Sequence, residues 1–275
     1  MEIKKLPTVT VITVSFNAAA TIERTIRSIL DQDYPAVDYV IVDGGSTDGT
    51  LDVIRLYENH LGRWISERDR GISDAFNKGV ALAHGDFISF VNADDWLSPG
   101  QISAAMAAFS AFPEAAFVFG DLLCYENDKL AFRQVGHSNY RSSLRYRMDP
   151  LNHPSMVVRR ALFDAVGGFR LDYKRAMDLD WLQRVDRANY VGIYDSRIVG
   201  NFSLGGISQR CARETMEEVR RCSIANYGRP FSSWAYYVYA LTKRSLRTGL
   251  SQWTSPAFAN RVREIVNPGF RNIRL

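Results

Sequence analysis

The sequence predicts an α/β fold in which helices flank a mostly parallel sheet, with a helical extension at the C-terminal end. Over the first 120 residues, short apolar runs rich in β-branched residues alternate with segments of helical periodicity. The runs are apolar at almost every position, which is typical of parallel strands covered on both faces. With 275 residues, 46% of them hydrophobic and 23% charged, the chain is large enough for one well-packed core.

The predicted elements follow one another along the chain. Strands are predicted where the apolar runs stand, at residues 9–14, 39–42, 64–66, 87–91 and 156–158. Helices are predicted where apolar residues recur three and four positions apart. There are four such segments: one with Ile22 and Ile26, one after Thr50, one with Phe76 and Val80, and one with Trp181 and Val185. No internal repeat or linker divides the chain. We therefore expect one main domain at residues 1–206, with halves at about 1–120 and 121–206, and an extension at 207–275.

The extension is the basic part of the chain. The net charge is +4, but residues 207–275 hold twelve Lys or Arg against four Glu, so the extension carries +8 and the remainder −4. Aromatic and cationic residues interleave from Trp234 to Arg247, as in a helix that lies on an anionic membrane surface. A terminal helix that packs on the core and exposes a basic face fits the same spacing. No recognised nucleic-acid motif accompanies the charge, so no nucleic-acid partner is expected.

Cysteine usage and the N-terminal residues indicate the compartment. Cys124, Cys211 and Cys222 are widely spaced and form no CxxC pair, which favours neither a disulfide framework nor a zinc site. The chain starts with polar residues, and no apolar run approaches the about 18 residues of a spanning helix. We expect a cytoplasmic protein, either soluble or at the inner face of the cell membrane.

Polar and glycine-rich segments follow the first two predicted strands. The first strand runs into Ser15 and Asn17, and the second into the turn from Asp43 to Thr50. In open parallel sheets, ligands bind at the carboxyl ends of the strands. We expect Asp43 to contact a ligand there, and Ser46 and Asp48 to cap and form turns. The spacing is neither a dinucleotide fingerprint nor a P-loop.

Two adjacent carboxylates, Asp94 and Asp95, follow the apolar run at 87–91. Carboxylate oxygens suit hard cations such as Mg²⁺ and Mn²⁺, and Mg²⁺ is commonly held by one or two carboxylates together with substrate phosphates. The pair therefore indicates a metal site for a phosphate-bearing ligand. The alternative is a solvated turn that caps the helix after Pro99.

Four motifs in a fixed order carry a family resemblance. They are VSFNA, VDGGSTDGT, a D-x-G-x-x-x-A-x-N-x-G segment and GDFISFVNADDW, within residues 9 to 97. This order resembles the family 2 glycosyltransferases, which have the Rossmann-like GT-A nucleotide-sugar-binding fold. The resemblance implies a nucleotide-diphospho-sugar donor and a divalent cation, Mn²⁺ or Mg²⁺, with Asp94 and Asp95 as metal ligands. It implies donor contacts at Thr13, Ser15, Asn17, Asp43, Gly44, Asp69, Gly71, Asn77 and Asp94. Asn92 departs from the family, since many relatives carry a third acid there.

A further acidic motif, Asp178-Leu179-Asp180, resembles the family's motif at the acceptor-binding helix. The resemblance implies that one of these carboxylates is the catalytic base, which takes the proton of the acceptor hydroxyl during an inverting transfer. We favour Asp178 over Asp180. Relatives often have Glu-Asp where this chain has Met177-Asp178. The alternative is that both carboxylates are N-caps of the helix around Trp181.

Two segments resemble a bacterial branch of the family that decorates surface polysaccharides or glycolipids. In the first, His153 contacts either the acceptor or the phosphate end of the donor, or it is a structural hydrogen-bonding residue. In the second, Gly205 and Gly206 either close as a lid over the diphosphate or form a plain turn.

The residues and the resemblance together predict a metal-dependent inverting glycosyltransferase. It would move a sugar from a nucleotide diphosphate to a hydroxyl of a glycan or lipid-linked acceptor in bacterial polysaccharide or glycolipid biosynthesis. One alternative is a sugar nucleotidyltransferase, which would be expected to carry a triphosphate-binding loop where this chain has Ser15 and Asn17. The other is a catalytically silent nucleotide-sugar-binding partner.

Overall fold

The computed structural model describes residues 6–146, 151–205, 211–253 and 270–271. Its N-terminal half is a parallel sheet, with strands in the order β4-β1-β2-β3. These strands are β1 (Val9–Ser15), β2 (Val37–Asp43), β3 (Arg63–Ser66) and β4 (Phe87–Asn92). Each coincides with a predicted apolar run, so the strand predictions for this half are confirmed.

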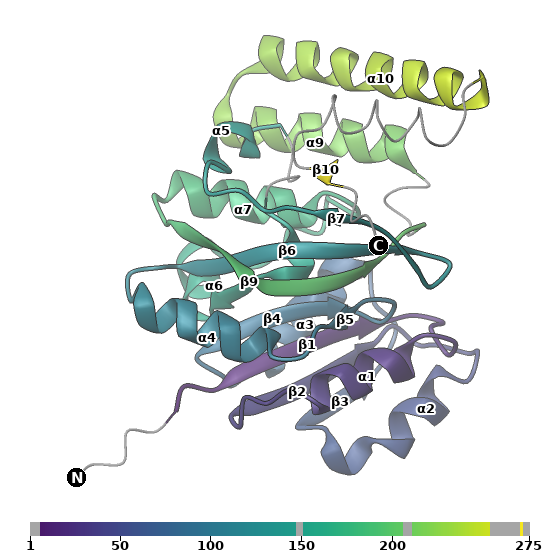
Figure 1. The fold of residues 1–275 in the computed structure, drawn as a ribbon, viewed down its shortest axis with the longest axis vertical. Coiled ribbons are helices and arrows are strands. Elements are labelled where there is room, and N and C mark those ends of the chain that lie inside the picture. The colour runs from purple at the N-terminus through teal and green to yellow at the C-terminus, as the bar shows by residue number, and fades with distance from the viewer. Residues whose placement is uncertain (1–5, 147–150, 206–210, 254–269, 272–275) are drawn as a thin grey trace.

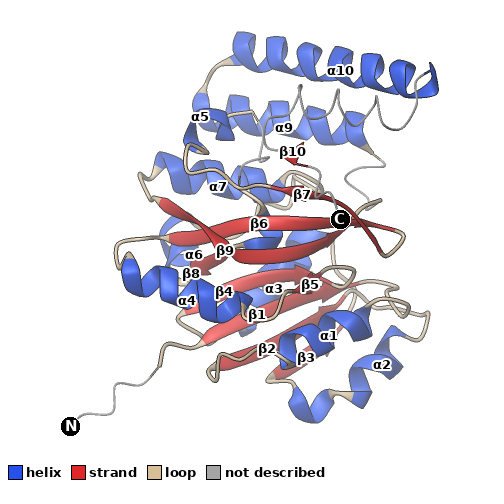
Figure 2. Cartoon of the chain, viewed as in Figure 1, coloured by secondary structure: helices blue, strands red, loops and turns tan. Residues whose placement is uncertain are grey.

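The second half continues the same sheet with mixed strand directions (Figure 2). β8 (Val157–Arg159) pairs antiparallel with β4 and with β6 (Phe117–Glu126), and β6 pairs parallel with β9 (Gly192–Ser203). Three further strands complete the described part of the sheet: β5 (Trp96–Leu97) on β9, β7 (Lys129–Gln134) on β6, and β10 (Phe270–Arg271) on β7. Of these strands only β8 was predicted from the sequence.

Helices cover both faces of the sheet. One face carries α1 (Ile22–Leu30), α2 (Thr50–Leu56) and α4 (Gln101–Ala111), and the other carries α3 (Ile72–Leu82), α6 (Ala161–Val166) and α7 (Met177–Arg187) (Figure 1). Shorter helical turns are η1 (Glu58–His60), α5 (Arg141–Leu144) and η2 (His153–Ser155). The four helices predicted from periodicity are α1, α2, α3 and α7.

Two apolar cores form because successive strand residues point to opposite faces. Along β1, Val9 and Val11 pack with Ile26 of α1, whereas Ile12 and Val14 pack in the cluster that contains α3 and α7. In the second cluster the Trp181 ring stacks on Phe163, with ring centroids 4.6 Å apart. Burying a large apolar side chain contributes about 1.5–3 kcal/mol to the free energy of unfolding. Packing on both faces therefore holds the strands, and with them the residues at their carboxyl ends, in fixed positions.

Two long helices, α9 (Ala212–Tyr227) and α10 (Pro230–Trp253), form the C-terminal layer. α9 packs on α7, and α10 packs on α9 as the outermost layer at the top of Figure 1. In the described part of the chain, none of the helices combines the length and the hydropathy needed to cross a bilayer.

Candidate active site

The sheet register brings three predicted segments to one edge. Ser15 at the end of β1 lies opposite Asp43 at the end of β2, and Val14 lies opposite Asn92 at the end of β4. The ladder continues past the strands, because the Gly44 N–H donates to the Ser15 carbonyl at 2.8 Å. The loops after β1, β2 and β4 therefore share the carboxyl edge of the sheet, where ligands bind in folds of this type.

Asp43 organises the glycine-rich turn. Its buried carboxylate accepts hydrogen bonds from the hydroxyls of Ser15 (2.9 Å), Ser66 (2.8 Å) and Ser46 (2.5 Å), and from the N–H groups of Gly45 (3.0 Å) and Ser46 (2.8 Å). Burial alone would raise the pKa of Asp43, but these hydrogen bonds outweigh it and hold the pKa below its usual value. A direct contact between Asp43 and a ligand would have to displace one of these bonds.

The loops after β1 and β2 are tied together. The Asn17 N–H donates to the Ser46 hydroxyl at 2.8 Å, and the Asn17 side chain accepts from the Thr47 N–H at 2.9 Å. Asp48 accepts from the Thr50 N–H at 3.1 Å, which agrees with its expected turn-forming role. Thr13 lies inside β1, fully buried, and accepts a hydrogen bond from the Tyr39 hydroxyl, so the structure does not bring it to the open edge.

A carboxylate and an exposed aromatic ring flank Gly44. A Cβ at this position would lie 2.5 Å from Oδ2 of Asp69 and 3.4 Å from Cδ2 of Phe16, so a side chain here would push the Asp69 carboxylate away from the turn. The Phe16 ring is 65% exposed although it lies at the ligand edge. Asp69 also accepts the Gly71 N–H at 2.8 Å, and Gly71 adopts a φ of +111° at the start of α3. Phe16 was not singled out from the sequence, because an aromatic residue after a strand reads as core.

The side chain of Asn77, a predicted donor contact, forms hydrogen bonds to the backbone of the protein. It donates to the Phe169 carbonyl and accepts from the Phe169 N–H, each at 2.8 Å. The amide oxygen also lies 2.5 Å from where a Cβ of Gly168 would stand. The structure therefore places Asn77 as a lock between α3 and the segment before α7, with both ends of its amide engaged.

Asp94 and Asp95 differ in their surroundings. Asp95 is 1% exposed and accepts the Ser203 N–H at 2.9 Å and the Asn92 side-chain N–H at 3.1 Å. Asp94 is half-buried, and its backbone carbonyl accepts the Ser203 hydroxyl at 2.6 Å. Burial raises the pKa of Asp94, and burial together with the Asp94 charge raises the pKa of Asp95 to about 8. Asp95 is thus anchored by protein groups on both oxygens.

These residues fit a divalent cation. The two carboxylates, whose pKa values are raised, lie in one loop with Asn92, which donates to Asp95 and whose Oδ1 is a buried oxygen without a hydrogen-bond partner. All three groups offer oxygen atoms, the ligands that Mg²⁺ and Mn²⁺ prefer. Within the described ranges, no cluster of three or more His, Cys, Asp or Glu side chains is arranged to hold a metal. Ser203, which bonds to both Asp94 and Asp95, was missed from the sequence because β9 was not predicted.

The two acids of α7 have different roles in the structure. Asp180 is fully buried and accepts hydrogen bonds from Arg184 (3.0 Å), Arg170 (3.2 Å) and Asn226 (3.0 Å). Asp178 is half-buried and accepts the N–H of the next residue in its own helix at 2.7 Å. Burial raises the pKa of Asp178, and the facing His153 works in the opposite direction. Asp180 is therefore the centre of an internal ion-pair network, whereas Asp178 is held less tightly.

His153 is presented to Asp178 by a strained turn. Asn152 adopts a φ of +42°, which its side chain supports by donating to the Gly120 carbonyl at 2.7 Å and accepting from Gln134 at 2.6 Å. The His153 ring stacks on Phe90 of β4, with ring centroids 5.7 Å apart. Burial lowers the pKa of His153, and the charge of Asp178 opposes this shift. His153 thus links the end of β4 to the start of α7.

Gly205 follows β9 with a φ of +95°, two residues after Ser203. The segment that leads to Gly205 therefore starts from the residue that clamps the Asp94–Asp95 loop. Gly206, the second glycine of the predicted lid or turn, lies outside the described residues.

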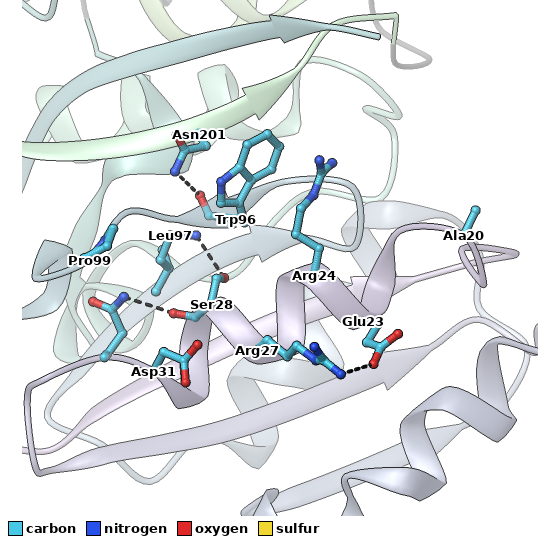
Figure 3. A pocket seen from close by; sticks show the side chains of 11 residues that line it. Ala20, Glu23, Arg24, Arg27, Ser28, Asp31, Trp96, Leu97, Pro99 and Asn201 are labelled. Carbon is cyan, nitrogen blue, oxygen red and sulfur yellow. Dashed lines mark hydrogen bonds and ion pairs between the residues drawn. The ribbon is translucent and has the colours of Figure 1, made fainter. Parts of the chain in front are cut away.

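A cavity of about 590 Å³ lies on the α1 side of the same loop (Figure 3). Its polar walls bond to one another: Leu97 N–H donates to the Ser28 hydroxyl at 3.1 Å, and Asn201 donates to the Trp96 carbonyl at 3.2 Å. Arg24 stacks 3.7 Å above the Trp96 ring centroid. The cavity is lined by Ala20, Glu23, Arg24, Arg27, Ser28, Asp31, Gln32, Trp96, Leu97, Pro99 and Asn201. None of the predicted site residues that the structure describes is among them. The contacts in its wall connect α1 to the segment that follows Asp94 and Asp95.

The mixed sheet with its acidic carboxyl edge defines a GT-A type α/β fold, as predicted. The sequence model of the family described as "Glycosyl transferase family 2" matches residues 10–166, so the chain belongs to this family. It is 35% identical over 179 residues to a "PGL/p-HBAD biosynthesis glycosyltransferase" of Mycobacterium bovis, covering 64% of this chain and 68% of that protein.

Two solved structures show the same fold. The mannosyltransferase PcManGT of Pyrobaculum calidifontis, in complex with GDP-Man and Mn²⁺, superposes with a TM-score of 0.64 at 21% identity, covering 97% of this chain and 83% of that one. Residues 1–349 of TarS of S. aureus, in complex with UDP-GlcNAc, superpose with a TM-score of 0.61 at 19% identity, covering 85% and 71%. Of the longer TarS chain, this protein spans 41%.

Proposed function

We propose that the protein transfers a sugar, with inversion, from a nucleotide-diphospho-sugar to a hydroxyl of a glycan or lipid-linked acceptor in bacterial polysaccharide or glycolipid biosynthesis. The observation that carries the proposal is the carboxylate pair after β4, whose pKa values are raised at the ligand edge of the sheet. Membership of the glycosyltransferase family and the similarity to the mycobacterial glycosyltransferase and to the two solved structures support it.

In this proposal Asp94 is the direct ligand of Mn²⁺ or Mg²⁺, and Asp95 holds the loop in place. Asp95 already uses both oxygens in hydrogen bonds to Ser203 and Asn92, whereas the half-buried Asp94 does not. When bound, the cation would neutralise charge that develops on the departing nucleoside diphosphate. Asp94 also places the negative charge that attracts the cation at the sheet edge.

The nucleobase would lie against the exposed Phe16 ring beside Gly44. A flat base gains contact by stacking on an aromatic face, and the Asp69 carboxylate next to Gly44 accepts a base N–H. Asp43 would act indirectly, because it shapes the turn that holds Gly44.

Asp178 would be the general base. A catalytic base works best when its pKa is close to the working pH, and burial raises the pKa of Asp178 in that direction. Asp178 would take the proton of the acceptor hydroxyl as that oxygen attacks the anomeric carbon opposite the diphosphate. His153, which faces Asp178, would border the acceptor side of the site.

The test is turnover of UDP-GlcNAc and GDP-mannose with Mn²⁺ or Mg²⁺. The Asp94→Ala, Asp95→Ala double variant should lose turnover, whereas Asp52→Ala, an exposed aspartate on α2, should keep it. Asp178→Asn should lose transfer and keep donor affinity. Unchanged turnover in the double variant would refute the proposal.

Two other outcomes would favour the alternative functions. Pyrophosphate release from a nucleoside triphosphate and a sugar phosphate would favour a nucleotidyltransferase. Donor binding without transfer across a broad acceptor panel would favour a catalytically silent partner.

We further propose that α10 is the surface that meets an anionic membrane. Phe231, Trp234 and Tyr239 on this helix are 89%, 61% and 55% exposed. α10 contains Lys243, Arg244 and Arg247 and neither Asp nor Glu. Exposed aromatic side chains on a cationic helix suit a negatively charged lipid interface, and the same charge disfavours pairing of two copies through this helix.

Vesicle sedimentation tests the membrane proposal. The full chain should bind phosphatidylglycerol vesicles more strongly than phosphatidylcholine vesicles, and the Phe231→Ala, Trp234→Ala variant should bind less. Phe112→Ala, which removes an aromatic ring 50% exposed at the end of α4, is the matched control. Equal binding to both vesicles, or none to either, would contradict an electrostatic membrane contact.

A further inference from the structure

The turn that delivers Asp178 to the site is held from the C-terminal layer. Three consecutive backbone N–H groups, those of Lys174, Arg175 and Ala176, donate to one oxygen, Oε2 of Glu218, at 3.0, 2.7 and 3.0 Å. Glu218 lies on α9 and is 8% exposed. Ala176 directly precedes Met177, the first residue of α7, so the held turn ends two residues before Asp178.

The chemistry of this contact makes it strong. Hydrogen bonds from backbone N–H groups to a carboxylate are charge-assisted and shorter than neutral ones. A negative charge near the N-terminal end of α7 is also favoured by the helix dipole. The opposite side of the turn is fixed by α3, because the Ser73 hydroxyl donates to the Tyr173 carbonyl at 2.7 Å. The turn is therefore held between α3 and α9.

We propose that Glu218 is a positioning residue for sugar transfer, because it fixes the turn at residues 174–176 and thereby sets where Asp178 stands at the reacting centre. The proposal rests on the role of Asp178 as the base. It places a determinant of the reaction on α9, beyond the residues 10–166 that match the family.

Charge supports the same role. The titratable groups that interact with Asp178 are His153 from η2 and Glu218 and Cys222 from α9; burial raises the pKa of the Cys222 thiol, so the thiol stays uncharged at neutral pH. Burial is the main cause that raises the pKa of Asp178, His153 lowers it, and the like charge of Glu218 raises it. Neutralising Glu218 should therefore lower the pKa of Asp178, a change that a purely structural contact would not produce.

The variants are Glu218→Ala, which removes the acceptor, and Glu218→Gln, which keeps an acceptor oxygen and removes the charge. Glu217→Ala is the matched control, because Glu217 lies next on the same helix and pairs with Arg220 at the surface. The readout is release of nucleoside diphosphate from UDP-GlcNAc and GDP-mannose with Mn²⁺, with kcat and donor KM measured separately.

Glu218→Ala should lower kcat about 10²-fold, the effect of displacing a reacting group by about 1 Å, with the donor KM within about twofold of wild type. Glu218→Gln should retain more of the kcat and move the acid limb of the pH profile of kcat to lower pH. Amide hydrogen exchange should be faster at residues 174–176 in Glu218→Ala than in Glu217→Ala.

A folded Glu218→Ala variant with wild-type kcat would overturn the proposal, and so would equal losses in kcat and donor affinity. If Glu218→Ala does not fold, an unmoved acid limb in Glu218→Gln overturns it. Absence of donor turnover in the wild-type chain would instead count against the proposed function. In that event, unchanged amide exchange at 174–176 would still overturn the fixing of the turn by Glu218.

Discussion

Replacing Asp180 by asparagine removes the central charge of a buried network. Asp180 is fully buried and pairs with Arg184, whose side chain is 12% exposed, and with Arg170, whose side chain is 46% exposed. Burial already lowers the pKa of Arg184, and Asp180 is the main group that opposes this shift. Without Asp180 the Arg184 guanidinium stays buried with its charge uncompensated.

The size of the effect follows from this arrangement. Removing one partner of a buried ion pair costs about 3–5 kcal/mol. For a chain of this size, about 1 kcal/mol corresponds to about 2–4 °C in Tm, so Asp180→Asn should lower Tm by about 10 °C. Arg170 is half exposed and can turn to water, so most of the loss is assigned to Arg184.

Asp178→Asn should behave in the opposite way. The pKa of Asp178 is raised in the folded protein, so folding disfavours its charged form relative to the unfolded chain. The stability that this group contributes is present below its unfolded pKa and is lost as pH rises through the folded value. At neutral pH the uncharged amide should therefore leave the free energy of unfolding unchanged or increase it, while transfer is lost.

The assay is thermal unfolding of both variants at pH 7, together with donor turnover. A Tm of Asp180→Asn within about 2 °C of wild type would refute the argument that Asp180 is a structural ion-pair centre. A Tm of Asp178→Asn lowered as far as that of Asp180→Asn would show that both acids serve the fold.

Three further predictions follow from the same contacts. Asp43→Asn should lower the free energy of unfolding by about 2 kcal/mol at pH 7. Because the pKa of Asp43 is lowered, this difference from wild type is present above the unfolded aspartate pKa of about 4 and should shrink in urea unfolding as pH falls below it through the lower folded pKa. A constant difference would contradict this. Transfer should slow with falling pH at values above the usual aspartate range of about 4, since Asp178 has a raised pKa; a rate that is flat down to pH 4 would contradict this. Asn152→Ala should destabilise more than Asn152→Gly in urea unfolding, because φ is +42° there, and equal losses would contradict the strain.

Much of the parallel half could be predicted from the sequence, because its strands are continuous apolar runs and its helices are amphipathic. The runs at 9–14 and 87–91 became β1 and β4. The acids at the end of β2 and after β4 lie at the carboxyl edge of the sheet, beside the polar residues that follow β1, as the alternation of strands and helices predicted.

The second half could not be predicted in the same way, because its strands depend on distant partners. β6 is interrupted by Gly120 and the buried Asp121, and β9 alternates irregularly between buried and open residues, so neither shows a clear period. The β9 residue Ser203 contacts Asp95 across 108 positions of the chain. Such contacts leave no local pattern.

The separate roles of neighbouring acids were also beyond the sequence. Asp178 and Asp180 are two residues apart, but only the structure shows that Asp180 meets Arg170, Arg184 and Asn226. In the sequence, Glu218 is one acid among many basic residues of the extension. Its role follows from the packing of α9 beside α7, which brings its carboxylate to the N–H groups before α7.

The most direct test of the account is Mn²⁺ binding followed by electron paramagnetic resonance, with UDP and GDP added in turn. The wild-type chain should bind Mn²⁺ more tightly with one of the two nucleotides present, and Asp94→Asn should lose this binding while the exposed Asp52→Asn retains it. Mn²⁺ affinity in Asp94→Asn equal to that of wild type, with the same nucleotide, would contradict the assignment of the metal and donor site.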